Sequence, residues 1–351
     1  MFPQTKRSKR ALAFVLVILA VGCALPFLLS NRQIEPSFYY WKTTFRLSQG
    51  EKQTIDEQNI NRLYIRLFDV GWDNTINAPV PLGKFTFSNR ESFSGDVTPV
   101  VYITNKVFVQ INPSAIDSLA MRLYAQVLSI AKRADFSFDE LQIDCDWTET
   151  TRASYFLFLK QLSDIAGHNG IALSATIRLH QIKYKQVTGV PPVSRGMLMF
   201  YNIGDLNAKV AHNSIYNSVD ADKYVAYINS YSLTLDVALP IYTWAVQTRE
   251  GKIIQLLSNY NHSDFKKLGF TRIDSTYYKA SASFFYRGIY FMEGDIIEVE
   301  SISPKLALEA AQLLSSKLPK AKRSVVLFSL DSLNIAQYEK EDFKNIFSCF
   351  R

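Results

Sequence analysis

The sequence predicts an α/β fold, a (β/α)8 TIM-type barrel with a small β-rich subdomain inserted between its seventh and eighth strands. Eight short β-rich runs recur along the chain, with helical or loop-rich segments between them, which is typical of parallel strands joined by crossovers. Eight such strands close a β/α barrel. With 351 residues, 48% of them hydrophobic, the chain is long enough to bury the core that this fold needs.

The connections between the predicted strands are mostly longer than hairpin turns, which disfavours an all-β sandwich. The eight strands are expected at residues 38–43, 63–70, 98–104, 140–146, 171–178, 197–202, 236–244 and 324–329.

Three of the intervening segments have the periodicity of amphipathic helices. Residues 114–133 and 152–166 place apolar side chains at three- and four-residue spacing, so each forms one apolar stripe. A third helix is predicted to begin at Ser303 and Pro304, a capping residue followed by proline at the first helical position, and to end near Leu318.

Two segments depart from a regular barrel. Residues 71–96 predict a loop and a hairpin with no clear helix, and residues 248–303 contain β-rich pieces at 252–257 and 288–300. We interpret the second segment as a small sheet at the barrel mouth, because the loops of that face are where such barrels carry insertions. No internal repeat or linker divides the chain, so residues 31–351 are predicted to form a single domain.

Residues 1–30 predict a membrane-targeting segment. Four cations within the first ten residues precede the uncharged, mostly apolar run 11–29, which predicts an N-terminus in the cytoplasm and a domain across the membrane. Residues 19–23 resemble the lipobox of bacterial lipoproteins, whose cysteine is lipidated after cleavage. The resemblance implies lipidation of Cys23. The alternative is an uncleaved anchor, since the run approaches the roughly 20 residues that span a bilayer. Both alternatives predict an extracytoplasmic domain attached to the bacterial membrane or envelope.

The charge balance does not favour a nucleic-acid partner. The formal charge is +7, from 39 basic and 32 acidic residues. Lys6, Arg7, Lys9 and Arg10 precede the predicted domain, and without them 35 basic groups face 32 acidic ones. Because the domain is nearly neutral, we expect no nucleic acid among its partners. We also expect a monomer.

Residues 138–147, Phe-Asp-Glu-Leu-Gln-Ile-Asp-Cys-Asp-Trp, combine a buried strand with carboxylates on one face. Because side chains alternate along a strand, Gln142, Asp144 and Asp146 project to the same side. Acidic residues on an otherwise apolar strand cost free energy unless a partner or a ligand uses them. Asp144 and Asp146 also lie at the C-terminal end of the strand, where β/α barrels form their active sites.

Other strand ends supply further polar and aromatic side chains. On the fifth strand, Ser174, Thr176, Arg178 and His180 alternate with apolar residues and are expected to face the barrel interior. Aromatic rings beside carboxylates are what a sugar-binding cleft needs, because pyranose faces are apolar and their rims hydrogen-bond. We therefore predict a carbohydrate ligand. The candidate ligand-contacting residues are Trp41, Asp69, Gln142, Arg178, His180, Asn202, Tyr242 and Trp244.

Two of these segments resemble signatures of family 18 glycoside hydrolases, the chitinase type. Residues 139–146 resemble the fourth-strand signature Asp-Gly-x-Asp-x-Asp-x-Glu, and residues 199–202, Met-Phe-Tyr-Asn, are similar to the sixth-strand Met-x-Tyr-Asp. In this match Asp146 occupies the position of the acid glutamate, Asp144 that of the aspartate beside it, and Tyr201 that of the tyrosine that supports the reacting N-acetyl group. Gln142 stands where an aspartate is expected.

The resemblance implies substrate-assisted hydrolysis. Asp146 would protonate the glycosidic oxygen, while Asp144 and Tyr201 orient the acetamido group of the substrate, which attacks the anomeric carbon. Two carboxylates this close together are expected to raise the pKa of one of the pair, which suits an acid at neutral pH.

From residue 38 onward the chain also resembles an uncharacterised bacterial family, domain of unknown function 3142. The resemblance rests on residues 142–146, the helix that contains Tyr155, residues 173–176 and the late piece 294–300. It implies a barrel of glycosidase type and no established reaction.

The residues leave other interpretations open. In the ordinary scheme of glycosidases, Asp146 pairs with a carboxylate from another strand, such as Asp69 or Asp331. Alternatively, Asp144 and Asp146 form structural ion pairs with Arg178 or Arg66. A separate alternative is a catalytically inactive barrel that binds a glycan or a partner at the membrane surface. It is favoured because Asp146 stands where the signature has glutamate and Gln142 stands where it has aspartate.

We expect no cofactor or metal. The sequence contains no glycine-rich phosphate loop, nucleophile elbow or zinc-type histidine pair. His168, His212 and His262 lack metal-ligand spacing. These absences disfavour nucleotide-dependent and serine-hydrolase functions.

Overall fold

The computed structural model describes residues 34–87, 93–206, 212–267 and 269–351. A closed barrel of eight parallel strands forms its centre, in the order β1-β18-β10-β9-β8-β7-β6-β3, and pairing between β1 and β3 closes the circle. All eight strands overlap the predicted runs, so the predicted TIM-type barrel is confirmed. The barrel strands are β1 (Ile34–Tyr40), β3 (Arg62–Asp73), β6 (Asp96–Ile103), β7 (Glu140–Asp144), β8 (Ala172–Arg178), β9 (Arg195–Met199), β10 (Leu235–Pro240) and β18 (Arg323–Phe328).

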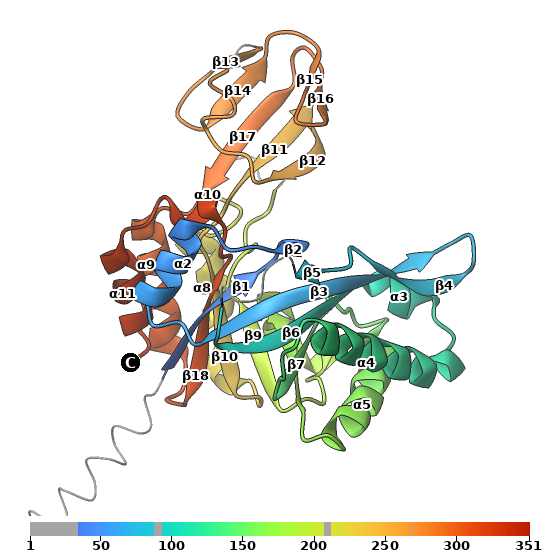
Figure 1. Ribbon diagram of the computed structural model, residues 1–351. Coiled ribbons are helices and arrows are strands. Elements are labelled where there is room, and N and C mark those ends of the chain that lie inside the picture. Colours follow the sequence, from blue (N-terminus) through green and yellow to red (C-terminus); the bar gives the residue numbers. More distant parts are fainter. Residues whose placement is uncertain (1–33, 88–92, 207–211, 268) are drawn as a thin grey trace, which may run out of the picture.

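Helices surround this barrel (Figure 1), and the three predicted from their apolar stripes are present. Ser303 caps the third of them, α9, because its side chain accepts a hydrogen bond from the backbone N–H of Leu306. The helices are α2 (Gln49–Glu57), α3 (Asn105–Gln110), α4 (Ile116–Arg133), α5 (Arg152–Gly167), α6 (Leu179–Lys183), α7 (Lys185–Thr188), α8 (Ser218–Val225), α9 (Pro304–Lys317), α10 (Ser332–Ile335) and α11 (Lys340–Ser348), with short 3-10 turns at Pro113–Ala115 and Ile228–Ser230.

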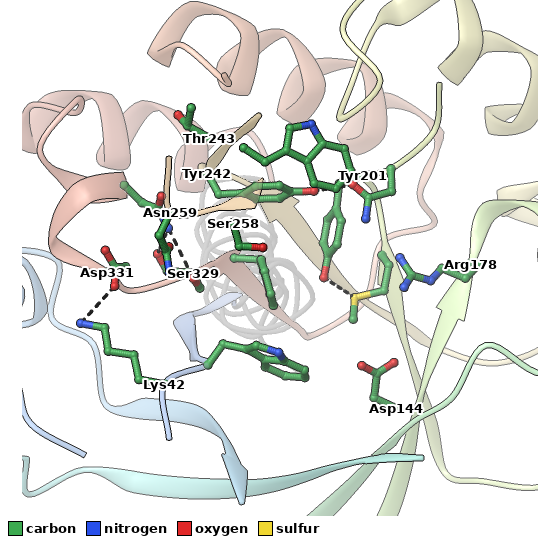
Figure 2. Close-up of a pocket in the computed structure, with 16 residues that line it drawn as sticks. Lys42, Asp144, Arg178, Tyr201, Tyr242, Thr243, Ser258, Asn259, Ser329 and Asp331 are labelled. Atoms are coloured by element: carbon green, nitrogen blue, oxygen red, sulfur yellow. Dashed lines mark hydrogen bonds and ion pairs between the residues drawn. The ribbon is translucent and has the colours of Figure 1, made fainter. Parts of the chain in front are cut away.

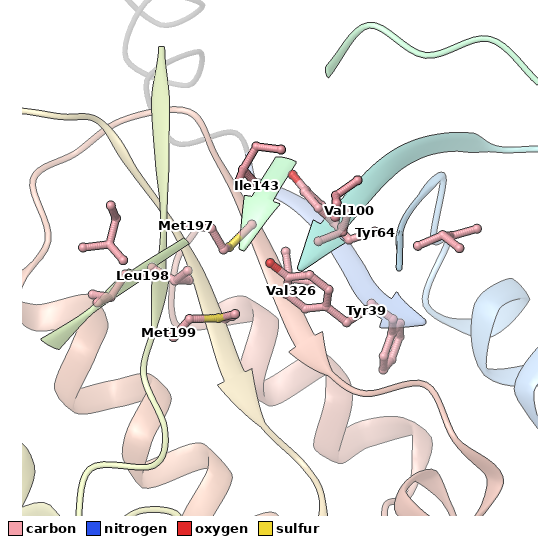
Figure 3. Close-up of a cluster of buried hydrophobic side chains, with 14 of the residues drawn as sticks. Tyr39, Tyr64, Val100, Ile143, Met197, Leu198, Met199 and Val326 are labelled. Carbon is pink, nitrogen blue, oxygen red and sulfur yellow. The ribbon is translucent and has the colours of Figure 1, made fainter. Parts of the chain in front are cut away.

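The barrel core is formed by large side chains from many strands (Figure 3). Tyr39, Tyr64, Val100, Met197 and Val326 are all fully buried. Their close packing holds the strand ends in fixed positions, so side chains that follow these ends are held on a rigid frame.

The inserted subdomain is a five-stranded antiparallel sheet in the order β12-β11-β17-β14-β13. It projects beyond the barrel (Figure 1) and has its own core, which includes Tyr278, Phe291 and Ile297. The sheet begins at Thr243, five residues before the predicted start of the insertion. Its strands are β11 (Thr243–Arg249), β12 (Lys252–Ser258), β13 (Phe270–Arg272), β14 (Tyr277–Ala280) and β17 (Ile296–Ser301), with a hairpin of β15 (Phe284–Tyr286) and β16 (Ile289–Phe291).

The segment after β3 forms the expected hairpin. Strand β4 (Ala78–Leu82) pairs antiparallel with the end of β3, and β5 (Thr86–Phe87) pairs with β2 (Thr44–Phe45). The described residues of this segment contain no helix, as expected.

The predicted membrane segment and Cys23 lie outside the described residues. Within the described part of the chain, no helix has the length and apolar character needed to cross a membrane.

Candidate active site

A pocket of about 300 Å³ opens at the C-terminal ends of the barrel strands, beside the inserted sheet (Figure 2). Seven predicted site residues line it: Trp41, Asp144, Arg178, Tyr201, Asn202, Tyr242 and Trp244. They come from segments between residues 41 and 244, and closure of the barrel brings them together.

Asp144 is the last residue of β7 and is almost completely buried, with 5% of its surface exposed. The hydroxyl of Thr176, on the neighbouring strand β8, donates a hydrogen bond of 2.7 Å to Asp144 Oδ1. Burial, together with the negative charges of Asp146 and Asp69, raises the pKa of Asp144 to about 6, against the lowering effects of Arg178 and of the Thr176 hydrogen bond. Asp144 is therefore the carboxyl of the predicted pair with the raised pKa.

Asp146 is held by an ion pair with Arg178. The Nε of Arg178 lies 2.5 Å from Asp146 Oδ1, and its Nη2 lies 3.2 Å from Oδ2. The Asp146 side chain is 44% exposed and does not line the pocket, whereas Arg178 does. The ion pair considered from the sequence is thus present for Asp146, and it uses Arg178 rather than Arg66.

Tyr201 and Asn202 follow strand β9 directly. The Tyr201 hydroxyl donates to the sulfur of Met199 at 2.9 Å, and its ring lies 5.3 Å from that of Phe328. Asn202 has φ of +55°, in the left-handed region, and its side-chain oxygen accepts a hydrogen bond from the Tyr242 hydroxyl. Such backbone strain is often found at functional sites, where the surrounding structure maintains it.

Tyr242 and Trp244 line the pocket, but they do not belong to the seventh barrel strand as predicted. The seventh barrel strand, β10, ends at Pro240, so Tyr242 lies in the connection that follows and Trp244 lies on β11 of the inserted sheet. The sequence prediction extended the seventh strand through Trp244 because the β-rich pattern continues without a break. Glu300, on β17, fixes the Trp244 ring by accepting a 2.7 Å hydrogen bond from its Nε1.

Three predicted ligand-contacting residues do not line the pocket. Gln142 is fully buried inside the barrel, where it accepts a hydrogen bond from the Tyr39 hydroxyl and donates one to Ser174. Asp69 is paired with Arg66, three residues earlier on β3. His180 is exposed on α6, because β8 ends at Arg178 and the alternation expected from the sequence stops there.

Other residues complete the pocket. Lys42 follows Trp41, and its Nζ contacts the fully buried Glu51 at 2.6 Å and Asp331 at 3.2 Å. Phe328 ends β18, and Ser258 and Asn259 come from the end of β12. Lys42 could have been predicted from the sequence, because it follows the end of a barrel strand, β1. No sequence pattern indicates that Ser258 and Asn259, at the end of β12, would line this pocket. The described residues contain no group of three or more His, Cys, Asp or Glu side chains that could hold a metal ion.

Solved structures with the same fold include a spore cortex-lytic enzyme and chitinases. The spore cortex-lytic enzyme SleL of Bacillus cereus is 12% identical, with a TM-score of 0.53 over 91% of this chain and 75% of its own. The chitinase of Chromobacterium violaceum is 12% identical, with a TM-score of 0.51 over 89% of this chain and 98% of its own. The family 18 chitinase of Cycas revoluta in complex with allosamidin is 11% identical, with a TM-score of 0.54 over 90% of this chain and 99% of its own.

These similarities show a TIM-type barrel like that of the family 18 chitinases, and at such low identity they show the fold alone. No family model matches the chain, and no curated protein matches it. The resemblance to domain of unknown function 3142 therefore stays a prediction.

Proposed function

We propose that the chain is a membrane-attached, extracytoplasmic barrel that binds a carbohydrate in its strand-end pocket and hydrolyses a glycosidic bond there. One observation carries this proposal: the buried Asp144 carboxyl lines a pocket that is also lined by the rings of Trp41, Tyr201, Tyr242 and Trp244. Aromatic faces suit the apolar faces of sugars, and a carboxyl in such a pocket is the group that glycosidases use.

Two carboxyls compete for the proton-transfer role. Asp144 lines the pocket, and its pKa of about 6 allows it to exchange a proton near neutral pH. Asp146, the acid implied by the resemblance to family 18, is half-exposed and engaged with Arg178. We therefore assign the proton exchange to Asp144 and a positioning role to Asp146, which acts through Arg178.

Asp331 is a candidate for the second carboxyl of an ordinary two-carboxylate glycosidase mechanism. Asp331 lines the pocket and contacts Lys42. Asp69, the other partner considered from the sequence, is engaged by Arg66 outside the pocket lining. Asp331 is thus the better candidate of the two.

The alternative function is a catalytically inactive barrel that binds a glycan or a protein partner. The Asp146–Arg178 ion pair favours it, because it occupies the position where the resemblance requires a free acid.

Attachment to the membrane belongs to the same proposal and rests on residues 1–30, with their four cations and apolar run. Extraction of the full chain from bacterial membranes, compared with a variant lacking residues 1–30, tests it. Release of the full chain by salt alone would contradict it.

The test of the carbohydrate proposal is a glycan-binding and hydrolysis screen of the full chain beside Asp144→Asn and Asp146→Asn. We expect Asp144→Asn to lose hydrolysis and keep binding, and Asp146→Asn to keep part of the hydrolysis. Full hydrolysis by Asp144→Asn, with loss in Asp146→Asn, would make Asp146 the acid. Binding without turnover by the unaltered chain would establish the inactive alternative, and no binding to any glycan would overturn the carbohydrate proposal.

A further inference from the structure

Both cations that line the pocket are already paired with carboxylates. Lys42 is paired with two carboxylates, Glu51 and Asp331, and Arg178 is paired with Asp146 through both oxygens. Asp144 has no ion-pair partner among the described residues. Among the described charged residues that line the pocket, Lys42, Arg178, Asp144 and Asp331, only Asp144 lacks a direct ion pair. Its negative charge attracts cations.

One oxygen of Asp144 is available to a ligand. Thr176 donates to Oδ1, but Oδ2 has no hydrogen-bond partner among the residues that the structure describes. Asp144 is more than nine-tenths buried, and its carboxyl points toward the pocket (Figure 2). A charged N–H donor of a ligand forms a stronger hydrogen bond with such a carboxylate oxygen than a neutral donor does.

Two aromatic faces in the pocket are also available to a cation. Arg66 lies over the Trp41 ring at 5.7 Å, and Arg178 lies over the Tyr201 ring at 5.9 Å. Among the described residues no cation lies over Tyr242 or Trp244, whose rings are 5.8 Å apart in an edge-to-face arrangement. Ring faces attract a cation that lies within about 6 Å.

The geometry points to an amino sugar with a free, protonated amine as the ligand of this pocket, in preference to an N-acetylated or an uncharged sugar. An ammonium group would donate a charge-assisted hydrogen bond to Asp144, which an acetamido group cannot match because it carries no charge. This inference rests on the proposed function, since it names the carbohydrate class that the same pocket takes.

The Tyr201 hydroxyl supports the same preference. The resemblance to family 18 assigns this hydroxyl to the acetamido group of a substrate, but here it donates to the Met199 sulfur. Binding of an acetamido group through Tyr201 would require that contact to break, whereas an ammonium at Asp144 leaves it intact.

The test compares three ligands of equal length on the full chain in detergent: glucosamine oligomers, N-acetylglucosamine oligomers and glucose oligomers. Titration calorimetry at pH 7 measures the affinities. We expect the glucosamine oligomer to bind at least tenfold more tightly than the other two. Equal or tighter binding of either of the others would overturn the amine preference and leave the carbohydrate proposal standing. No binding of any of the three would overturn the amine preference, and the wider glycan screen would then decide the carbohydrate proposal.

A variant and a pH series test whether Asp144 causes the preference for the glucosamine oligomer. Asp144→Asn should reduce the affinity ratio between the glucosamine and N-acetylglucosamine oligomers to less than threefold. Glu341→Gln, a change at an exposed residue on α11, should leave this ratio unchanged. In the unaltered chain the preference should shrink as the pH falls through about 6, where Asp144 becomes protonated. A preference that is constant between pH 5 and pH 7, or that survives Asp144→Asn, would contradict a role for Asp144.

Discussion

Arg178 binds both oxygens of Asp146, at 2.5 Å from Nε and 3.2 Å from Nη2, and it also lines the pocket that contains Asp144. One guanidinium thus influences two carboxyls in different ways. It fixes Asp146 by direct hydrogen bonds, and it lowers the pKa of Asp144 by its charge, against the larger effect of burial.

Replacement of Arg178 should change the titration of Asp144. In Arg178→Gln, the pKa of Asp144 should rise above about 6, because the largest opposing influence on it is removed. Carboxyl NMR titration measures this directly. Arg195→Gln is a matched control, since Arg195 forms a similar bidentate pair with Asp236 at the start of strands β9 and β10. An unchanged Asp144 pKa in Arg178→Gln would contradict the assignment.

Asp144→Asn should stabilise the protein above pH 6. Burial raises the pKa of Asp144 from 3.8 in its ordinary state to about 6, so the folded state favours the protonated form. Its cost to stability is absent below about pH 4, grows as the pH rises from about 4 to about 6, and levels off above that at no more than about 3 kcal/mol. Urea unfolding of Asp144→Asn at pH 4 and pH 8 measures the difference. Lower stability of the variant than of the unaltered chain at pH 8 would show that the charged form is favoured in the fold.

Glu300→Gln should lower both the stability of the protein and its affinity for a glycan, although Glu300 does not line the pocket. Glu300 accepts hydrogen bonds from Trp244 Nε1 at 2.7 Å and from the backbone and hydroxyl of Ser214 at 3.1 and 2.5 Å. The amide of glutamine cannot accept all of these, so we expect a loss of about 1–3 kcal/mol in stability. Glycan affinity should fall several-fold because the Trp244 ring is no longer fixed. Glu298→Gln, two residues earlier on β17, is the control, and an equal loss of affinity there would point to a general effect on the sheet.

Asn202 should be replaceable by glycine more easily than by alanine. Its φ of +55° is unfavourable for a residue with a Cβ and costs alanine about 1–2 kcal/mol. Both substitutions lose the hydrogen bond from Tyr242. The free energy of unfolding of Asn202→Ala should therefore be about 1 kcal/mol lower than that of Asn202→Gly. Equal stability of the two variants would indicate that the backbone relaxes at this position.

Local patterns predicted the elements of the fold well. The apolar stripe of α4, the Ser303–Pro304 start of α9 and the strand β7 that carries Asp144 all follow from periodicity and capping, which depend on residues close together in sequence. Local patterns failed at two boundaries. His180 continues the polar alternation of β8 but belongs to α6, and Trp244 continues a β-rich run but belongs to the inserted sheet.

Local sequence patterns were enough to predict the eight strands, their main helices, the inserted sheet and the carboxyls and rings at strand ends. Which of these side chains meet depends on the tertiary fold, because closure of the barrel and the position of β11 and β12 join residues far apart in the chain. The tertiary fold separates Asp144, which is buried in the pocket, from Asp146, which is bound to Arg178 outside the pocket lining. Burial and ion pairing depend on such distant neighbours, and no local pattern contains them.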